Sequence, residues 1–149
     1  MDKFNKFLPD KYKLFTFSYD QRLIFYISEK ELEKDNLTQN CLAWIETIWL
    51  EEDNEMSISW ITTNNGYKGN GLGTMLIIAA ATYHYKVNNI KQIVLDDFSN
   101  HAFLSNNIYT SVGLKYIEKK QPEMIGKSSV VIKKWKSFIN KYKNKKFYN

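Results

Sequence analysis

Three glycines, Gly69, Gly71 and Gly73, stand within five positions of this 149-residue sequence. A strand-like run precedes them at 56–63, and an apolar, helix-like run begins at Thr74. The first N–H groups of a helix have no partner inside the helix, and the helix dipole adds positive charge there. Glycine lets a phosphate approach the backbone and tolerates positive φ. This order predicts an anion-binding loop, with an ordinary strand-to-helix turn as the alternative.

Three common nucleotide loops do not fit the spacing of these glycines. A P-loop requires Gly-Lys followed by Ser or Thr, and lysine follows none of these three glycines. The dinucleotide-binding loop and the kinase glycine loop share the pattern G-x-G-x-x-G. Starting from Gly69 or Gly71, that pattern needs a further glycine where Thr74 or Leu76 stands. The anion must therefore be held by another kind of loop.

The letters KGNGLG, from Lys68 to Gly73, resemble the pyrophosphate-binding loop of the GNAT superfamily of acyl-CoA-dependent N-acetyltransferases. That loop usually reads Arg or Gln, two residues, Gly, one residue, and then Gly or Ala, so lysine replaces its first residue here. A second segment, NIYTSVGLKYI, resembles the family's later Tyr-x-x-x-Gly-Phe segment, with Tyr109 in place and Leu114 at the position of Phe. The resemblance extends over about 41–117.

The resemblance implies acetyl-CoA as the cofactor and a place for each part of it. The pantetheine arm would lie against the backbone of Ile61 and Thr63. The pyrophosphate would lie against the N–H groups of the loop, with the hydroxyl of Thr74 adding a bond. Asn100 or Asn106 would hold the pantetheine or the adenosine end. The loop residues concerned are Lys68, Gly69, Asn70, Gly71, Leu72 and Gly73.

Acetyl transfer from a thioester to an amine needs a base that accepts the amine proton and an acid that protonates the departing thiolate. Tyr109 matches the family's tyrosine and is the predicted acid. The strand before the loop offers only serines where many relatives carry a glutamate, so the base is expected elsewhere, or water relays the proton. The carboxylate candidates are Asp96, Asp97 and Glu46, each of which is equally explained as a solvated or structural acid.

Cysteine and histidine are scarce, which bounds the chemistry. With one cysteine, Cys41, and two histidines at no metal-ligand spacing, we expect no metal site and no intramolecular disulfide. The first residues lack the apolar core of a signal peptide, and no apolar run reaches the ~18 residues that a membrane span requires. We therefore expect a soluble, cytoplasmic protein without a membrane partner.

The elements around the candidate residues are expected to form one α/β (α+β) domain over 1–149. Aromatic and β-branched runs predict two hairpins, and longer apolar patterns predict buried helices. The segment 28–36 is either a short helix or a solvated connection. The resemblance implies a twisted, mixed but mostly antiparallel sheet, splayed between its fourth and fifth strands and flanked by helices. Strands are expected at 12–19, 22–28, 41–50, 56–63, 91–97 and 114–120, and helices at 74–87, 101–113 and 131–142.

Charge is unevenly divided along the chain. The net charge is +5, yet all 16 acidic residues precede residue 127, whereas eight of the 21 basic residues follow from there on. We expect a basic C-terminal helix or tail at about 128–149, docked by an apolar stripe with lysines on its other face. The stripe consists of Val131, Trp135, Phe138, Ile139 and Tyr142.

Two functional hypotheses follow. The first is an N-acetyltransferase that transfers the acetyl group of acetyl-CoA to a primary amine, either a small amine or polyamine or a protein amine, by direct attack. The mildly acidic body favours a cationic acceptor. The second is a GNAT-like, non-catalytic module that binds CoA, or that binds nucleic acid or another polyanion through its C-terminal lysines. A homodimer is compatible with either hypothesis.

Overall fold

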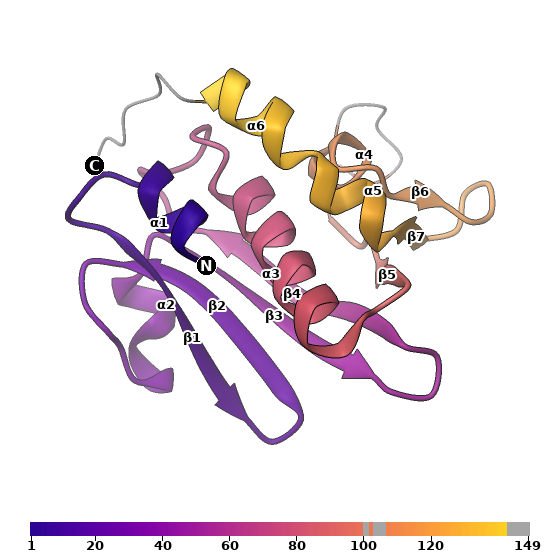
Figure 1. Cartoon of the computed structure of the whole chain (residues 1–149), viewed down its shortest axis with the longest axis horizontal. Helices are drawn as coiled ribbons and strands as arrows, with labels where there is room; N and C mark the ends of the chain where they lie inside the picture. The colour runs from indigo at the N-terminus through magenta and orange to yellow at the C-terminus, as the bar shows by residue number, and fades with distance from the viewer. Residues whose placement is uncertain (100–101, 103–106, 143–149) are drawn as a thin grey trace.

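The computed structural model describes residues 1–99, 102 and 107–142. Within this part of the chain, seven strands form one sheet in the order β1-β2-β3-β4-β5-β7-β6 (Figure 1). Every neighbouring pair is antiparallel except β4 and β5. The predicted mixed, mostly antiparallel sheet is confirmed. The strands are β1 Lys13–Tyr19, β2 Arg22–Ser28, β3 Ala43–Leu50, β4 Glu55–Thr63, β5 Gln92–Asp96, β6 Lys115–Tyr116 and β7 Glu123–Lys127.

Alternation along β2 divides its side chains between two hydrophobic clusters. Phe25 and Ile27 belong to the main core, to which α3 (Leu72–Asn88) also contributes, whereas Ile24 and Tyr26 belong to a smaller cluster. This division follows from the strand period of two, which points neighbouring side chains to opposite faces. Both predicted hairpins, β1–β2 and β3–β4, are confirmed.

The connection between β2 and β3 closes the smaller cluster. A short 3₁₀ turn, Lys34–Asn36, leads into α2, Leu37–Asn40, and the residues at 29–33 form no helix. Of the two alternatives for 28–36, the solvated connection is therefore the correct one for most of the segment. Leu32 and Leu37 are buried and anchor this connection over the sheet.

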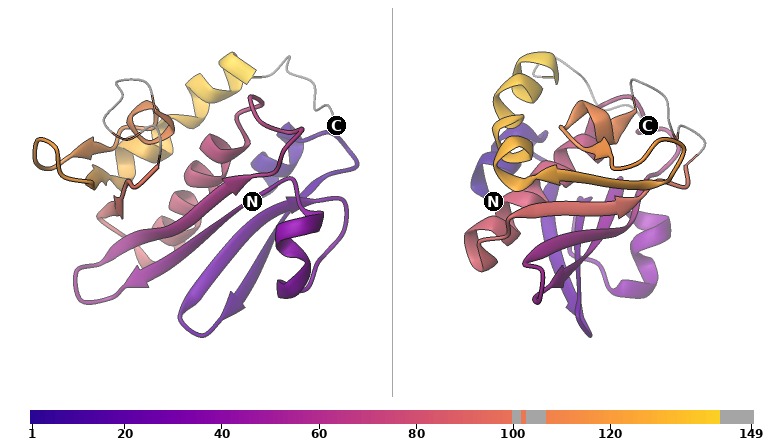
Figure 2. Two further views of the ribbon diagram at one scale, coloured as in Figure 1. Left: turned by 180° about the vertical axis from the view of Figure 1, so that it is seen from behind. Right: turned by 90° about the vertical axis from the view of Figure 1, so that its right-hand side faces the viewer.

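Four helices lie on the opposite face of the sheet from α2 (Figure 2). They are α1 Asp2–Phe7, α3, α5 Ser128–Lys133 and α6 Trp135–Tyr142. The helix predicted at 74–87 is confirmed as α3, which begins two residues earlier. The single helix predicted at 131–142 is divided in two at the α5–α6 junction. None of the helices in the described ranges combines the length and apolar character that crossing a membrane requires.

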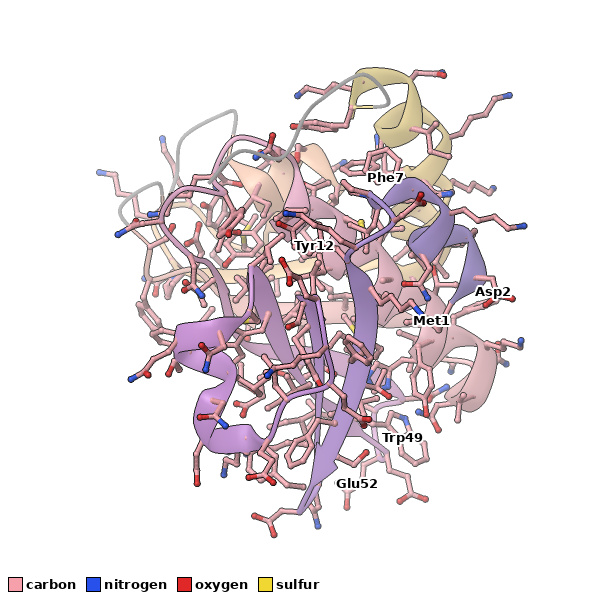
Figure 3. The ribbon with its side chains drawn as sticks, turned by 90° about the vertical axis from the view of Figure 1, so that its left-hand side faces the viewer. Met1, Asp2, Phe7, Tyr12, Trp49 and Glu52 are labelled. Atoms are coloured by element: carbon pink, nitrogen blue, oxygen red, sulfur yellow. The ribbon has the colours of Figure 1, made fainter. Side chains whose placement is uncertain are left out.

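The predicted apolar stripe of the C-terminal segment packs on the core, with Val131, Trp135 and Phe138 buried and Ile139 and Tyr142 partly buried, and α1 supplies part of its cover. The ring centroids of Phe4 and Trp135 lie 4.6 Å apart, and those of Phe7 and Phe138 lie 5.1 Å apart. Figure 3 shows Phe7 beside the C-terminal helix. Because α1 is only six residues long, it depends on these aromatic contacts and has no strong sequence pattern of its own.

The region after β5 differs most from the prediction. The strand expected at 114–120 shortens to β6, and the helix expected at 101–113 is described only as α4, Ile108–Ser111, because most of 100–106 lies outside the described residues. The strand β7, Glu123–Lys127, was not predicted. It pairs with β5 along its whole length and contains Gly126, where an added Cβ would lie 2.9 Å from the carbonyl oxygen of Gly113.

The sheet opens between β4 and β5. Their parallel pairing covers only Glu55 to Ser57 on β4, opposite Gln92 to Val94 on β5, whereas β4 continues to Thr63 along β3. The register between β3 and β4 shifts at Ser59, which has no opposing residue. Such a bulge bends its strand and increases the local twist. The predicted splay between the fourth and fifth strands is confirmed.

Candidate functional site

The glycine loop joins the end of β4 to the start of α3 and leaves a row of backbone donors unused. Of the hydrogen bonds formed within the described residues, none has its donor among the amide N–H groups of residues 68–74. Gly71 is the N-cap of α3, with φ 77°, and no side chain caps this helix. Unpaired N–H groups at the start of a 17-residue helix have the geometry that binds an anion.

The loop is held in shape by its own polar groups. The side-chain amide of Asn70 donates to the carbonyl of Tyr67 at 3.0 Å, and the N–H of Tyr67 donates to the carbonyl of Asn64 at 3.2 Å. Asn70 and Leu72 are both buried. Their side chains therefore serve the loop and the core, and only their backbone N–H groups remain for a ligand.

The three glycines meet different surroundings. A Cβ added at Gly69 would have no atom within 4 Å, so this side of the loop is open. A Cβ at Gly71 would lie 2.8 Å from the ring of Phe138 and 2.9 Å from that of Tyr142, so α6 covers this side. The cradle is thus closed on one side by protein and accessible on the other.

Gly73 brings the loop close to the strand predicted to hold a pantetheine arm. An added Cβ there would lie 2.7 Å from Cδ1 of Ile108, 3.7 Å from Cδ1 of Ile61 and 3.8 Å from Oγ1 of Thr63. The structure therefore places Ile61 and Thr63 of β4 beside the start of α3 and beside α4. The glycine loop therefore adjoins the part of β4 that has no β5 partner.

A cleft of about 410 Å³ occupies the opening between β4 and β5. Ser57 and Ser59 of β4 line one side, and Asp96 of β5 lines the other, together with Arg22 and Glu123. These residues come from four strands, and Ser59 is the bulged residue of β4. Asp96 is exposed, and within the described part of the chain no hydrogen bond engages its carboxylate. It is the predicted base that faces this cleft most directly.

Glu46, another base candidate, lies next to the cleft but is already engaged. Its carboxylate accepts a hydrogen bond from the hydroxyl of Tyr19 and forms a 2.8 Å ion pair with Arg22. Arg22 also reaches Oγ of Ser59 at 3.5 Å, and the Glu46 side chain is 13% exposed. The hydrogen bond to Glu46 raises the pKa of Tyr19. Glu46 thus positions Arg22 at the bulge, which suits a structural acid.

Asp97, the third base candidate, is 2% exposed and satisfied by neighbours. It accepts hydrogen bonds from the backbone N–H of Ser99 at 3.0 Å, from the Ser99 hydroxyl at 2.6 Å and from the Tyr116 hydroxyl at 2.7 Å. The side-chain amide of Asn107 lies 3.4 Å away. This bonding gives Asp97 a structural role, because the carboxylate joins the end of β5 to α4 and β6.

Tyr109, the predicted acid, lies in the first turn of α4 and is 9% exposed. Burial, with a smaller contribution from the charge of Asp97, raises the pKa of Tyr109 to about 12. Its hydroxyl forms no hydrogen bond with the residues that the structure describes. A tyrosine in this state keeps its proton at neutral pH and has it free to donate.

Two residues of the site were missed by sequence reasoning, and some predicted residues cannot be placed. Asn107 caps α4 by accepting from the N–H of Thr110 at 2.8 Å, and its position before a helical run was the available signal. Arg22 is the sole arginine, but nothing in the sequence pairs it with Glu46. Asn100 and Asn106 lie outside the described residues. Among residues 1–99, 102 and 107–142, no three His, Cys, Asp or Glu side chains gather as metal ligands.

A mixed sheet that opens between a bulged β4 and a parallel β5, with a glycine loop leading into α3, defines the fold of the GNAT acetyltransferases. Solved structures share the fold of this chain. A mutant form of the spermidine/spermine N-acetyltransferase SpeG from Vibrio cholerae is 14% identical, with a TM-score of 0.53, over 78% of this chain and 72% of that one. Nourseothricin acetyltransferase is 12% identical, with a TM-score of 0.54, over 72% and 66%.

An uncharacterised protein from Bacillus halodurans is 15% identical to this chain, with a TM-score of 0.57, over 83% of this chain and 68% of that one. No protein-family model matches the sequence, and no curated protein matches it. Identities this low establish the fold, and the chemistry depends on the site itself.

Proposed function

We propose that this chain is an N-acetyltransferase that uses acetyl-CoA and acetylates a primary amine by direct attack. The observation that carries the proposal is the row of unused amide N–H groups at 68–74, open to solvent at Gly69 and adjoining the unpaired edge of β4. An ordinary helix start leaves its first four N–H groups unpaired, and here the row of unused donors continues into the loop residues before the helix.

The residues present fit a CoA thioester. The helix start and the loop amides are complementary to a diphosphate in the sign of their charge, and exposed Lys68 adds positive charge at the entrance. The backbone of β4 at Ile61 and Thr63 has no β5 partner and is free to bond an amide-containing arm. When bound, acetyl-CoA would supply the acyl group as an activated thioester.

Two side chains, Tyr109 of α4 and Asp96 of the cleft, divide the proton transfers between them. Tyr109, with a pKa of about 12, keeps its proton until a thiolate departs and then donates it. Asp96, alone or through water, accepts the proton that the attacking amine loses, because Glu46 and Asp97 are held by other partners. The β4 bulge at Ser59 bends the strand beside the cleft that Asp96 lines.

The cleft favours a cationic amine. Asp96 and Glu123 line it, and the charge of Arg22 is balanced by the adjoining Glu46. Carboxylates at the mouth of a cleft raise the local concentration of a cation. A diamine or polyamine, with one amine at the thioester and another near these carboxylates, fits a cleft of about 410 Å³.

The test has two stages. Acetyl-CoA at concentrations well above micromolar should raise the melting temperature by mass action, because it binds the folded state. A panel of amines with acetyl-CoA should then reveal the acceptor by release of free thiol. Stabilisation without turnover of any amine would leave the non-catalytic CoA-binding module in place of the enzyme. The absence of stabilisation would reject both.

A further inference from the structure

A second hollow, of about 140 Å³, lies where α3, α4 and α6 meet. Thr74 of α3, Ser111 of α4, Lys134 at the α5–α6 junction and Lys141 of α6 contribute to its lining. The hollow is separate from the cleft between β4 and β5, with which it shares no residue. Of the residues that line it, only Thr74 was assigned a role above, as a residue that binds the diphosphate.

The hollow adjoins the glycine loop through two aromatic rings. Phe138 and Tyr142 both line it, their ring centroids lie 4.8 Å apart, and both rings approach Gly71. The ammonium group of Lys141 lies 5.2 Å from the centroid of the Tyr142 ring. Because the Tyr142 ring also approaches Gly71, α6 brings the positive charge of Lys141 close to the unused amides at the start of α3.

The positive charge in the hollow is not neutralised by the protein. The two ion pairs among the described residues, Lys11–Glu29 and Arg22–Glu46, leave Lys134 and Lys141 without an acidic partner. No acidic residue follows position 126 in the sequence. Lys134 is half-buried, with its Cε 3.9 Å from the position of a Cβ at Gly113, so its stem is held against the protein.

Two hydroxyl groups around the hollow already donate hydrogen bonds to backbone carbonyls and are not available to a ligand. The Ser111 hydroxyl donates to the carbonyl of Ile108 at 2.7 Å, and the Ser137 hydroxyl donates to the carbonyl of Lys134 at 3.0 Å. The two ammonium groups and the Thr74 hydroxyl remain for an incoming acceptor. Two cations without carboxylates and one hydroxyl suit a compact dianion.

We propose that this hollow is the subsite for the 3′-phosphate on the ribose of CoA, with Lys134 and Lys141 holding the phosphate. The inference rests on the proposed function, because it assumes that the diphosphate of CoA lies on the amides of residues 68–74. CoA carries its 3′-phosphate on the ribose next to that diphosphate, and the hollow is the lysine-lined depression beside the same helix start. The basic C-terminal segment thus serves cofactor choice, and the lysines select CoA over its dephosphorylated form.

The experiment compares acetyl-CoA with acetyl-3′-dephospho-CoA, by calorimetric titration of the full chain at one fixed ionic strength. The wild type should bind the dephosphorylated ligand at least about tenfold more weakly, since two charge-assisted contacts are lost. The double variant Lys134→Gln/Lys141→Gln should bind both ligands with equal affinity, at the wild-type level for the dephosphorylated one. The matched control, Lys133→Gln/Lys136→Gln, removes the same charge from exposed lysines of α5 and α6 that do not line the hollow, and it should keep the preference.

Three results would overturn the inference and leave the proposed function standing. The first is that the wild type binds the two ligands with equal affinity, and the second is that the Lys134/Lys141 variant keeps the preference for acetyl-CoA. The third is that the control variant loses the preference to the same extent, which would indicate only a general electrostatic attraction by the basic segment. A wild type that binds neither ligand would overturn the proposed function and this inference together. Unfolding of each variant, followed by circular dichroism, confirms that the comparison is made between folded proteins.

Discussion

The glycine loop and the cleft between β4 and β5 are built on opposite principles. In the loop, consecutive backbone N–H groups at 68–74 carry the binding capacity, and side chains such as Asn70 and Leu72 only maintain its shape. In the cleft, side chains from β2, β4, β5 and β7 carry the chemistry, and the backbone supplies the bulge at Ser59. One site is contiguous in the sequence, and the other is assembled by the sheet.

This difference explains how well each site should tolerate amino-acid substitutions. A backbone site depends on φ and on the absence of side chains, so a single methyl group can damage it. A side-chain site can lose one polar group and retain its shape, so its variants should change rates with little change in stability. Each substitution below tests this contrast.

The largest effect is expected from Tyr109→Phe, which removes the hydroxyl of the proposed acid in α4. Removing a general acid should lower kcat by roughly 10²–10⁴-fold, while the affinity for acetyl-CoA stays near that of the wild type. Stability should change little, because the hydroxyl makes no hydrogen bond with the described residues. Steady-state kinetics with a responsive amine measures this, and Tyr85→Phe, at an exposed position of α3, is the control. A kcat within threefold of wild type would remove Tyr109 from the mechanism.

In the loop, Gly71→Ala and Gly69→Ala should differ in what they damage. Both glycines have positive φ, which disfavours alanine by about 1–2 kcal/mol. At Gly71 the methyl group also meets the rings of Phe138 and Tyr142, and overpacking adds about 1–3 kcal/mol. We expect the larger loss of unfolding free energy in Gly71→Ala, measured in urea. Gly69→Ala should instead lower acetyl-CoA affinity, because its methyl group points into the open side of the loop. Equal effects on both quantities would contradict the proposed geometry.

The contrast between the two sites also decides what the sequence could predict. The loop was found because its glycines, the strand before them and the helix after them are adjacent in the chain, and the hairpins were found from runs of aromatic and β-branched residues on either side of short turns. The grouping of Arg22 with Asp96 and Glu123 could not be found, because these residues are far apart in the sequence and meet only through the strand order. No local pattern encodes that order.

The elements that were missed share a physical cause. The α1 helix is held by Phe4 and Phe7 against the C-terminal segment, and β7 is held by β5 on one side and β6 on the other. Both are short, so tertiary contacts decide their structure more than local preference does. Of the three carboxylates considered as bases, only burial and bonding separated Asp97 from Asp96, although they are neighbours in sequence.

Asp97→Asn tests whether Asp97 supports the structure beside the cleft and takes no part in its chemistry. The substitution places an amide donor among the donors of Ser99 and Tyr116, so at least one partly buried hydrogen bond to this side chain is lost. We expect a loss of unfolding free energy of about 2–3 kcal/mol, measured by urea denaturation. Asp96→Asn, one residue away and exposed, should change stability by less than about 0.5 kcal/mol. Similar losses in the two variants would mean that Asp97 does not hold α4 and β6 in place.

The pH dependence of stability should come from the core behind the cleft. His84 is 3% exposed, its Nε2 lies 2.8 Å from Oγ1 of Thr47, and burial lowers its pKa to about 4. In the unfolded chain its pKa is about 6.5, so between these values the unfolded state binds more protons and stability falls as pH falls. We expect a loss of about 2 kcal/mol from pH 7 to pH 5. In His84→Gln, the unfolding free energy should depend less steeply on pH over this range. An unchanged pH dependence would mean that groups other than His84 cause it.

The smallest effect is expected from Asp96→Asn on the reaction. An exposed carboxylate is a weak base, and water can replace it, so its main contribution should be the attraction of a cationic amine to the cleft. We expect kcat/KM for a diamine to fall about tenfold at low salt and less at high salt, because screening already weakens the attraction in the wild type. Glu46→Gln, which leaves Arg22 unpaired beside Ser59, should lower kcat/KM further by adding uncompensated positive charge. If neither variant responds to salt, the cleft does not select its acceptor by charge, and the amine must be recognised by shape along β4 and β5.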